Sequence, residues 1–177
     1  MKMFVQTVVA AFSFIFVALA PVSLAQDTVV AVATLPNSGT YFIVNRASGE
    51  ALQPVGPSVG QNVELYPFNR GGTQKWTLTR FIDPVTKKPT NRYNIRLAGD
   101  TPELELQPHD ISDRTAVLLP TKSVFVLKVK GEGFILESSK RNGDAMFSYP
   151  VANMQSEAHF APNDGSDKFV WAVLPAE

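Results

Sequence analysis

The sequence predicts an all-β fold built from three related units, and two observations lead to this prediction. Short runs of alternating apolar and polar residues recur along the chain, whereas no helical period is sustained over several turns. Prolines also recur at the ends of these runs, at similar spacings in three successive blocks. Because proline has no amide proton to give to a β-ladder, each such proline indicates where a strand leaves the sheet.

The strands of each block follow one another in the same order. Each block opens with an alternating strand, at residues 41–45, 93–97 and 134–138. Two further strands in each block end at a proline, and these prolines are Pro54 and Pro67, Pro108 and Pro120, and Pro150 and Pro162. A fourth strand closes each block around a bulky apolar residue, which is Trp76, Leu127 or Trp171. Four strands in register in each of three blocks indicate an internal repeat.

A threefold repeat of this kind has a physical purpose. One four-stranded unit cannot bury its apolar face, whereas three units around an axis can. This architecture is the β-trefoil, which the sequence predicts for residues 39–177, with repeats at about 39–80, 92–130 and 131–177. A β-sandwich would not explain the threefold register. The period of two places these residues in the core: Tyr41, Ile43, Trp76, Leu78, Tyr93, Ile95, Phe134, Leu136, Trp171 and Val173. It turns Phe42, Asn94 and Ile135 the other way.

The N-terminal segment has the features of a secretory signal peptide. A positive residue and an apolar run are followed by the small residues Ser23 and Ala25 before Gln26, as at a cleavage site. We therefore expect that residues 1–25 are removed and that the protein is secreted. Residues 26–38 then form an N-terminal arm, either floppy or paired as an extra strand.

Composition excludes several classes of function. The 16 Lys and Arg residues balance the 16 Asp and Glu residues, so no electrostatic footprint for nucleic acid or for a membrane is predicted. Without cysteine there is no disulfide, thiol nucleophile or thiolate zinc site. No nucleophile elbow or phosphate loop occurs, and neither His109 nor His159 has a second metal ligand at a regular spacing. We expect no enzyme activity, no metal and no other cofactor.

Short motifs in repeat one resemble those of the ricin-type trefoil. Residues 48–52, 63–67 and 74–77 together look like a repeat of that superfamily, and Gln74-x-Trp76 matches its short structural motif. The chain also resembles the small cysteine-free fungal protease inhibitors of the cospin and clitocypin kinds. Those proteins share a tyrosine-led first strand, as at Tyr41, and a closing tryptophan strand, as at Trp171. Both resemblances imply the fold, and each implies a different function.

The ricin-type resemblance implies a sugar site in which an aromatic ring stacks on the sugar while an Asp and an Asn hydrogen-bond to it. Tyr66 stands at the stacking position of repeat one, but Gln53 and Thr73 occupy the Asp and Asn positions. In the other repeats the acidic and stacking positions fall on Gln107 and Leu119, and on Tyr149 and Ala161. A carbohydrate-binding, lectin-like domain with degenerate sites is therefore the alternative hypothesis.

Protease inhibition through an exposed loop is the leading hypothesis. It rests on the trefoil pattern, the expected secretion and the missing catalytic groups. It also rests on the absence of Asp and Asn from the positions where a ricin-type sugar site needs them. An inhibitor that mimics a substrate needs an extended loop, with Lys or Arg for a trypsin-like pocket. Lys140 and Arg141, before an Asn-Gly turn, are the best match, and Arg70 and Lys168 are the reserves. The predicted partner is a trypsin-like serine protease, with a cysteine protease as the second choice.

Overall fold

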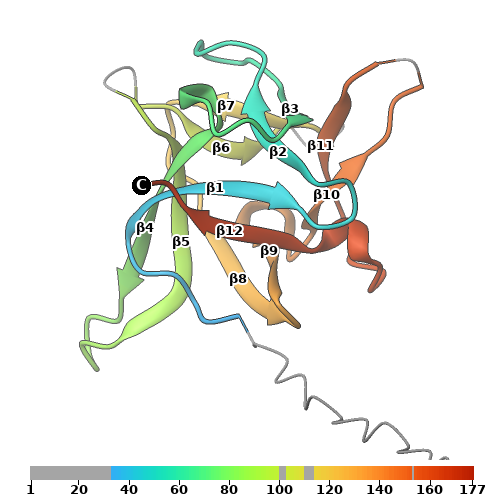
Figure 1. Ribbon diagram of the computed structural model, residues 1–177. Helices are drawn as coiled ribbons and strands as arrows, with labels where there is room; N and C mark the ends of the chain where they lie inside the picture. The colour runs from blue at the N-terminus through green and yellow to red at the C-terminus, as the bar shows by residue number, and fades with distance from the viewer. Residues whose placement is uncertain (1–32, 100–102, 110–113, 153) are drawn as a thin grey trace, which may run out of the picture.

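The computed structural model describes residues 33–99, 103–109, 114–152 and 154–177. The expected signal peptide lies outside the described residues. Twelve strands form one connected sheet (Figure 1). Their bounds are β1 Gly39–Asn45, β2 Glu50–Pro54, β3 Val63–Pro67, β4 Lys75–Ile82, β5 Pro89–Leu97, β6 Glu105–Pro108, β7 Ala116–Leu119, β8 Phe125–Lys130, β9 Gly133–Ser138, β10 Ala145–Tyr149, β11 Ser156–Ala161 and β12 Trp171–Pro175. The short 3-10 helices are η1 Gly72–Gln74, η2 Ser139–Arg141 and η3 Asp167–Phe169.

The strands are arranged as a closed barrel with three hairpins attached. Antiparallel pairing runs from β1 to β4, β5, β8, β9 and β12, and from β12 back to β1, which closes the ring. The remaining strands form the hairpins β2–β3, β6–β7 and β10–β11. Each hairpin also pairs with its neighbours, through β3 with β11 and through two isolated bridges at β7. This is a β-trefoil, so the predicted fold is confirmed.

The core repeats the same contacts in each third of the barrel. Tyr41 pairs with Trp76, Tyr93 pairs with Phe125, and Phe134 pairs with Trp171. Both indoles are fully buried, and their Nε1 atoms donate to the equivalent carbonyls of Leu52 at 3.0 Å and Met146 at 2.9 Å. The equivalence of the two tryptophans was predicted. The closing residue of repeat two is Phe125, however, and Leu127 lies where repeat one has Leu78.

Most of the predicted core residues are fully buried, whereas Tyr41 and Val173 are only partly buried against the core. Of the three residues that were expected to face away from the barrel axis, Phe42 and Ile135 pack into separate clusters outside it, whereas Asn94 donates to the carboxylate of Glu105 at 3.2 Å and to the carbonyl of Ser123. Phe42 lies with Val44 and Ala51, and Ile135 lies with Phe147 and Phe169. Each cluster joins residues of a barrel strand, β1 or β9, to residues of the hairpin strand that follows it, β2 or β10.

The described part of the N-terminal arm, residues 33–38, is neither a strand nor a loose tail. The amide of Ala33 donates to the carbonyl of Gly131 at 3.1 Å, and Tyr93 Oη donates to the carbonyl of Pro36 at 2.7 Å. Leu35 packs against the main core. The arm therefore lies across the barrel end opposite hairpins β2–β3 and β6–β7 (Figure 1). Among the described residues, no helix has the length and apolar character needed to cross a bilayer.

Candidate functional site

The outer faces of the three hairpins are equivalent surfaces that carry different chemistry. Leu52 pairs with Leu65, Leu106 with Leu118, and Met146 with Phe160, which sets the equivalence. The ricin-type resemblance places an Asp directly after Leu52 and its equivalents. In this structure that position holds Gln53, Gln107 or Phe147. Tyr149 therefore lies two residues beyond that position, because Ser148 occupies the place of Pro54 and Pro108. The register makes Tyr66, Leu119 and Ala161 equivalent to one another, which is the alignment that the sequence predicted.

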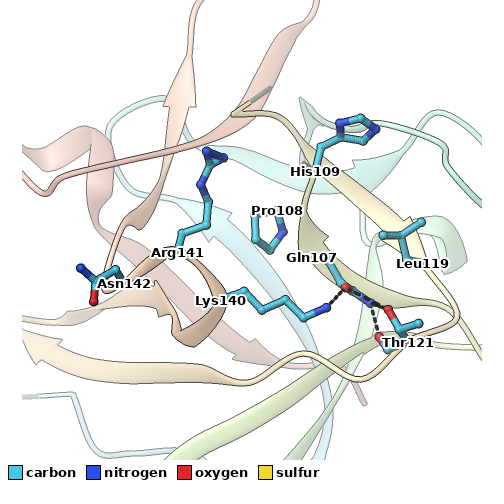
Figure 2. A pocket seen from close by; sticks show the side chains of 8 residues that line it. All are labelled: Gln107, Pro108, His109, Leu119, Thr121, Lys140, Arg141 and Asn142. Atoms are coloured by element: carbon cyan, nitrogen blue, oxygen red, sulfur yellow. Dashed lines mark hydrogen bonds between the residues drawn. The ribbon is translucent and has the colours of Figure 1, made fainter. Parts of the chain in front are cut away.

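A pocket of about 680 Å³ lies against the hairpin of repeat two. Figure 2 shows that side chains from hairpin β6–β7 face side chains from the turn that contains η2. The lining residues are Gln107, Pro108, His109, Leu119, Thr121, Lys140, Arg141 and Asn142. The pocket thus joins Gln107 and Leu119, which lie on the hairpin of repeat two, to residues of the η2 turn in repeat three.

Gln107 organises the polar wall of this pocket. The side chain is fully buried, and its Nε2 donates to the hydroxyl of Thr121 at 2.9 Å and to the carbonyl of Thr121. Its Oε1 accepts from Lys140 Nζ (Figure 2). Because a buried amide with these partners has one orientation, Thr121 and Lys140 are held in place while both residues remain exposed to solvent. The apolar part of the wall comes from Pro108 and Leu119.

The local sequence explains why the turn of Lys140 and Arg141 folds toward the pocket. Ser138 Oγ accepts from the amide of Lys140 at 3.2 Å and starts the 3-10 turn, and Asn142 then adopts a left-handed φ of 51°. The Arg141 side chain is 12% exposed and lies 3.6 Å from the carboxylate of Asp144. A substrate-like inhibitory loop needs extended backbone and projecting side chains. The backbone of this turn is a 3-10 turn, and its two basic side chains are directed to Gln107 and Asp144, so the structure does not favour the predicted inhibitory loop.

The two reserve candidates for an inhibitory loop also have partners within the protein. The guanidinium of Arg70 lies 5.8 Å from the ring centroid of Phe68. The ammonium of Lys168 pairs with Asp164 at 2.9 Å and lies 5.2 Å from the ring centroids of Phe147 and Phe169.

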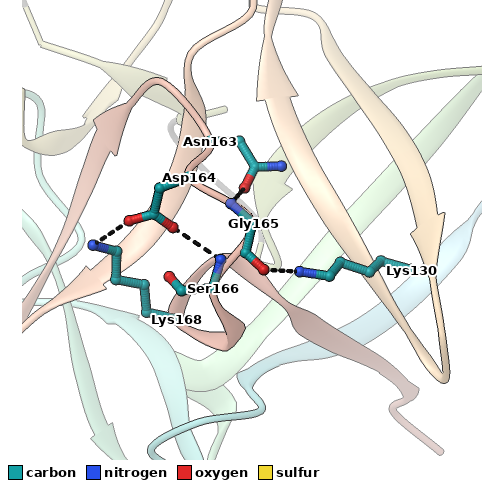
Figure 3. A network of polar contacts seen from close by, with 6 residues as sticks. All are labelled: Lys130, Asn163, Asp164, Gly165, Ser166 and Lys168. Carbon is teal, nitrogen blue, oxygen red and sulfur yellow. Dashed lines mark hydrogen bonds and ion pairs between the residues drawn. The ribbon is translucent and has the colours of Figure 1, made fainter.

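The loop around Lys168 is held by a network of short-range contacts, shown in Figure 3. Asp164 accepts from the amide of Ser166 at 2.9 Å, and Lys130 Nζ donates to the carbonyl of Gly165. Hydrogen bonds from Ser166 and from Lys168 hold the pKa of Asp164 well below its usual range. The loop is therefore a closed turn and not an extended segment that a protease could bind.

The face of hairpin β2–β3 contains the predicted stacking residue, Tyr66. Its hydroxyl donates to the carboxylate of Glu64 at 2.8 Å, and this bond raises the pKa of Tyr66. Glu64 in turn pairs with Gln53 across the hairpin. Gln74 is fully buried, donates to the carbonyl of Pro67 at 3.0 Å and accepts from a loop amide, so its role is to hold the loop. Sequence reasoning missed Glu64, although alternation places it on the same strand face as Tyr66.

The face of hairpin β10–β11 is aromatic. The rings of Tyr149 and His159 stack with centroids 4.7 Å apart, and His159 Nε2 lies 2.6 Å from the carboxylate of Glu157. Phe147 contacts both rings edge-on. Within the described ranges, no group of three or more His, Asp or Glu side chains is placed to hold a metal ion.

No protein-family model matches the chain, and no curated protein matches it. Solved structures are similar in fold. The designed threefold-symmetric protein ThreeFoil is 21% identical with a TM-score of 0.63, over 77% of this chain and 98% of that one. The Rhizoctonia solani agglutinin is 17% identical with a TM-score of 0.65, over 82% and 99%. A ricin B-like lectin from Macrolepiota procera, solved in complex with lactose, is 15% identical with a TM-score of 0.61, over 81% and 99%. At these identities, the likeness shows the β-trefoil fold alone.

Proposed function

We propose that this protein binds a carbohydrate in the pocket between hairpin β6–β7 and the η2 turn. The observation that carries the proposal is the fixed polar wall: the buried Gln107 amide orients the Thr121 hydroxyl and the Lys140 ammonium beside the apolar Pro108 and Leu119. The pocket has a volume of about 680 Å³, which lies within the usual range for sites that bind small molecules.

A sugar suits this chemistry because it offers apolar C–H patches and many hydroxyl groups. The Lys140 ammonium has three donors, and the Thr121 hydroxyl can both donate and accept. Since these groups are already oriented, little ordering cost is added on binding. The fold supports the proposal in a general way, because similar structures include an agglutinin and a lectin solved with lactose. Binding without catalysis is part of the proposal, as is secretion, which rests on the sequence of residues 1–25.

A glycan array followed by calorimetry with the bound glycan tests this proposal. Lys140→Ala and Thr121→Ala should each weaken binding, and the double variant should lose about tenfold or more in affinity because hydrogen bonds to a charged group are lost. Lys122→Ala is the matched control, since Lys122 is exposed beside Thr121 but does not line the pocket.

The same titrations distinguish the repeat-two pocket from the predicted repeat-one site. Tyr66→Ala should leave the affinity unchanged, because Tyr66 lies on a different hairpin face. Loss of binding in Tyr66→Ala with full binding in the pocket variants would move the site to hairpin β2–β3. Absence of any glycan binding at millimolar concentration would refute the proposed function.

A further inference from the structure

The hairpin formed by β4 and β5 is longer than its equivalent in repeat two. There, β8 and β9 pair as far as Lys130 and Gly133 and are joined by a tight turn. In repeat one, pairing continues past a register shift to Ile82 and Pro89, and residues 83–88 form the loop. Figure 1 shows this hairpin projecting from the lower left of the molecule, away from hairpins β2–β3 and β6–β7.

Apolar side chains at the tip of this hairpin are exposed to solvent. The exposed fraction is 39% for Phe81, 55% for Ile82 and 86% for Val85. Among the other large apolar residues that are exposed in the described part of the chain, Val55 and Val59 share the loop between β2 and β3, and the rest are spread over several elements. Phe81, Ile82 and Val85 are three such residues within five positions of one another on a projecting hairpin. Exposed apolar side chains gathered at one projecting tip indicate a binding surface.

Hydrogen bonds within the loop hold the tip in one conformation. The Asp83 carboxylate accepts from the amides of Val85 at 2.8 Å and Thr86 at 2.7 Å. The backbone of Asp83 bonds to Lys87 and Lys88, both at 2.9 Å. These bonds fix the loop so that Val85 points outward, and they engage the negative charge of Asp83 within the turn. The amides of Thr86 and Val85 hold the pKa of Asp83 below its usual value.

Basic residues flank the apolar tip. Between residues 80 and 92 there are four basic residues, Arg80, Lys87, Lys88 and Arg92, and Asp83 is the only acidic one. The balanced charge of the whole chain therefore conceals a local excess of positive charge at this tip. The expectation that no membrane would be bound came from the whole-chain balance, which does not apply to a single projecting element.

We infer that the tip of the β4–β5 hairpin binds the surface of an anionic lipid bilayer. Ile82 and Val85 enter the boundary between head groups and acyl chains, while Lys87 and Lys88 contact lipid phosphates. A bilayer fits this surface better than a protein partner does. A narrow convex tip offers little of the area of about 800 Å² per partner that a stable protein interface buries.

This inference is independent of carbohydrate binding. The pocket lies against hairpin β6–β7, and the β4–β5 tip projects away from that hairpin. A protein bound to a bilayer through the tip therefore keeps its pocket open to solvent. Either activity can be lost without the other.

Co-sedimentation with phosphatidylcholine vesicles, made with and without phosphatidylserine, tests the inference. The wild-type protein should bind the vesicles that contain phosphatidylserine. Ile82→Glu/Val85→Glu should lower the partition coefficient by about tenfold or more, because two apolar side chains no longer leave water. Lys87→Ala/Lys88→Ala should remove most of the dependence on phosphatidylserine, and added salt should weaken wild-type binding.

The matched control is Val55→Glu/Val59→Glu, which changes two exposed apolar residues, with exposed fractions of 53% and 55%, in the loop between β2 and β3. It should bind vesicles as the wild type does, and circular dichroism should show that all variants fold. The inference is overturned if wild type stays in solution with both vesicles, or if the control loses as much binding as the tip variants. It is also overturned if sedimentation velocity without lipid shows a dimer that the tip variants abolish, because a second copy would then cover the tip.

Discussion

Replacing Trp171 by alanine removes a fully buried indole and the hydrogen bond from its Nε1 to the carbonyl of Met146 at 2.9 Å. Truncation of a buried tryptophan costs about 3–5 kcal/mol, a large part of a total stability of about 5–15 kcal/mol. For a chain of this size, each kcal/mol lowers the melting temperature by about 2–4 °C, so we expect a fall of about 6–20 °C. Chemical unfolding, monitored by circular dichroism, measures the free energy of unfolding, and thermal unfolding measures the melting temperature.

Trp171→Phe separates packing from hydrogen bonding at the same position. Phe125 already occupies the equivalent place in repeat two, so the barrel accepts a phenyl ring there. The phenyl variant leaves the Met146 carbonyl without its donor, which costs about 1–3 kcal/mol. Trp76→Phe should have a similar effect, because Trp76 Nε1 donates to Leu52 at 3.0 Å in the same way.

Val129→Ala is the control for these measurements, since Val129 is exposed on β8, and its effect should stay within about 0.5 kcal/mol. If Trp171→Ala lowers the free energy of unfolding by less than about 1 kcal/mol, burial of the closing tryptophans does not supply a large part of the stability, which refutes this prediction. A loss in Trp76→Phe that is much larger or smaller than in Trp171→Phe would refute their structural equivalence.

Three further predictions concern the arm, the η2 turn and hairpin β2–β3. Leu35→Asp should lower the midpoint of urea unfolding, because Leu35 packs against the main core and a charge cannot be accommodated there. Trypsin activity should be unchanged by stoichiometric wild-type protein, since Lys140 and Arg141 are folded back against the protein; full inhibition would overturn this view of the turn. Glu64→Gln should lower the pKa of Tyr66 toward the ordinary tyrosine value, because the hydrogen bond to Glu64 raises it. The hydrogen bond is present at a pH below the usual pKa of tyrosine and is lost as the pH rises through the raised pKa of Tyr66. Ultraviolet titration of the protein, compared with Tyr66→Phe, measures the shift.

The succession of strands along the chain and the β-trefoil fold followed from the sequence because their signals are local. A period of two residues places Ile43, Ile95 and Leu136 on the core face whatever the rest of the chain does, and all three are fully buried. The Gln74-x-Trp76 motif likewise identified a buried pair, since its amide closes a loop within its own repeat.

The register of the later repeats depended on the tertiary structure. A proline indicates where a strand ends, but it does not fix how many residues lie between that end and the last core residue of the strand. Ser148 therefore stands where two repeats have proline, and Phe125 stands where two repeats have tryptophan. Pairing between strands decides these positions, because only one register buries the apolar face.

The candidate site could not be predicted from the sequence because its parts are distant in the chain. Lys140 bonds to Gln107, which is 33 residues away in another repeat, and Thr121 comes from a third segment. The sequence showed that Lys140 and Arg141 lie in a turn beside an Asn-Gly pair. Only the packing of the η2 turn against hairpin β6–β7 decided that these side chains line a pocket, because the direction of a side chain in a turn depends on the partner that the folded chain brings to it.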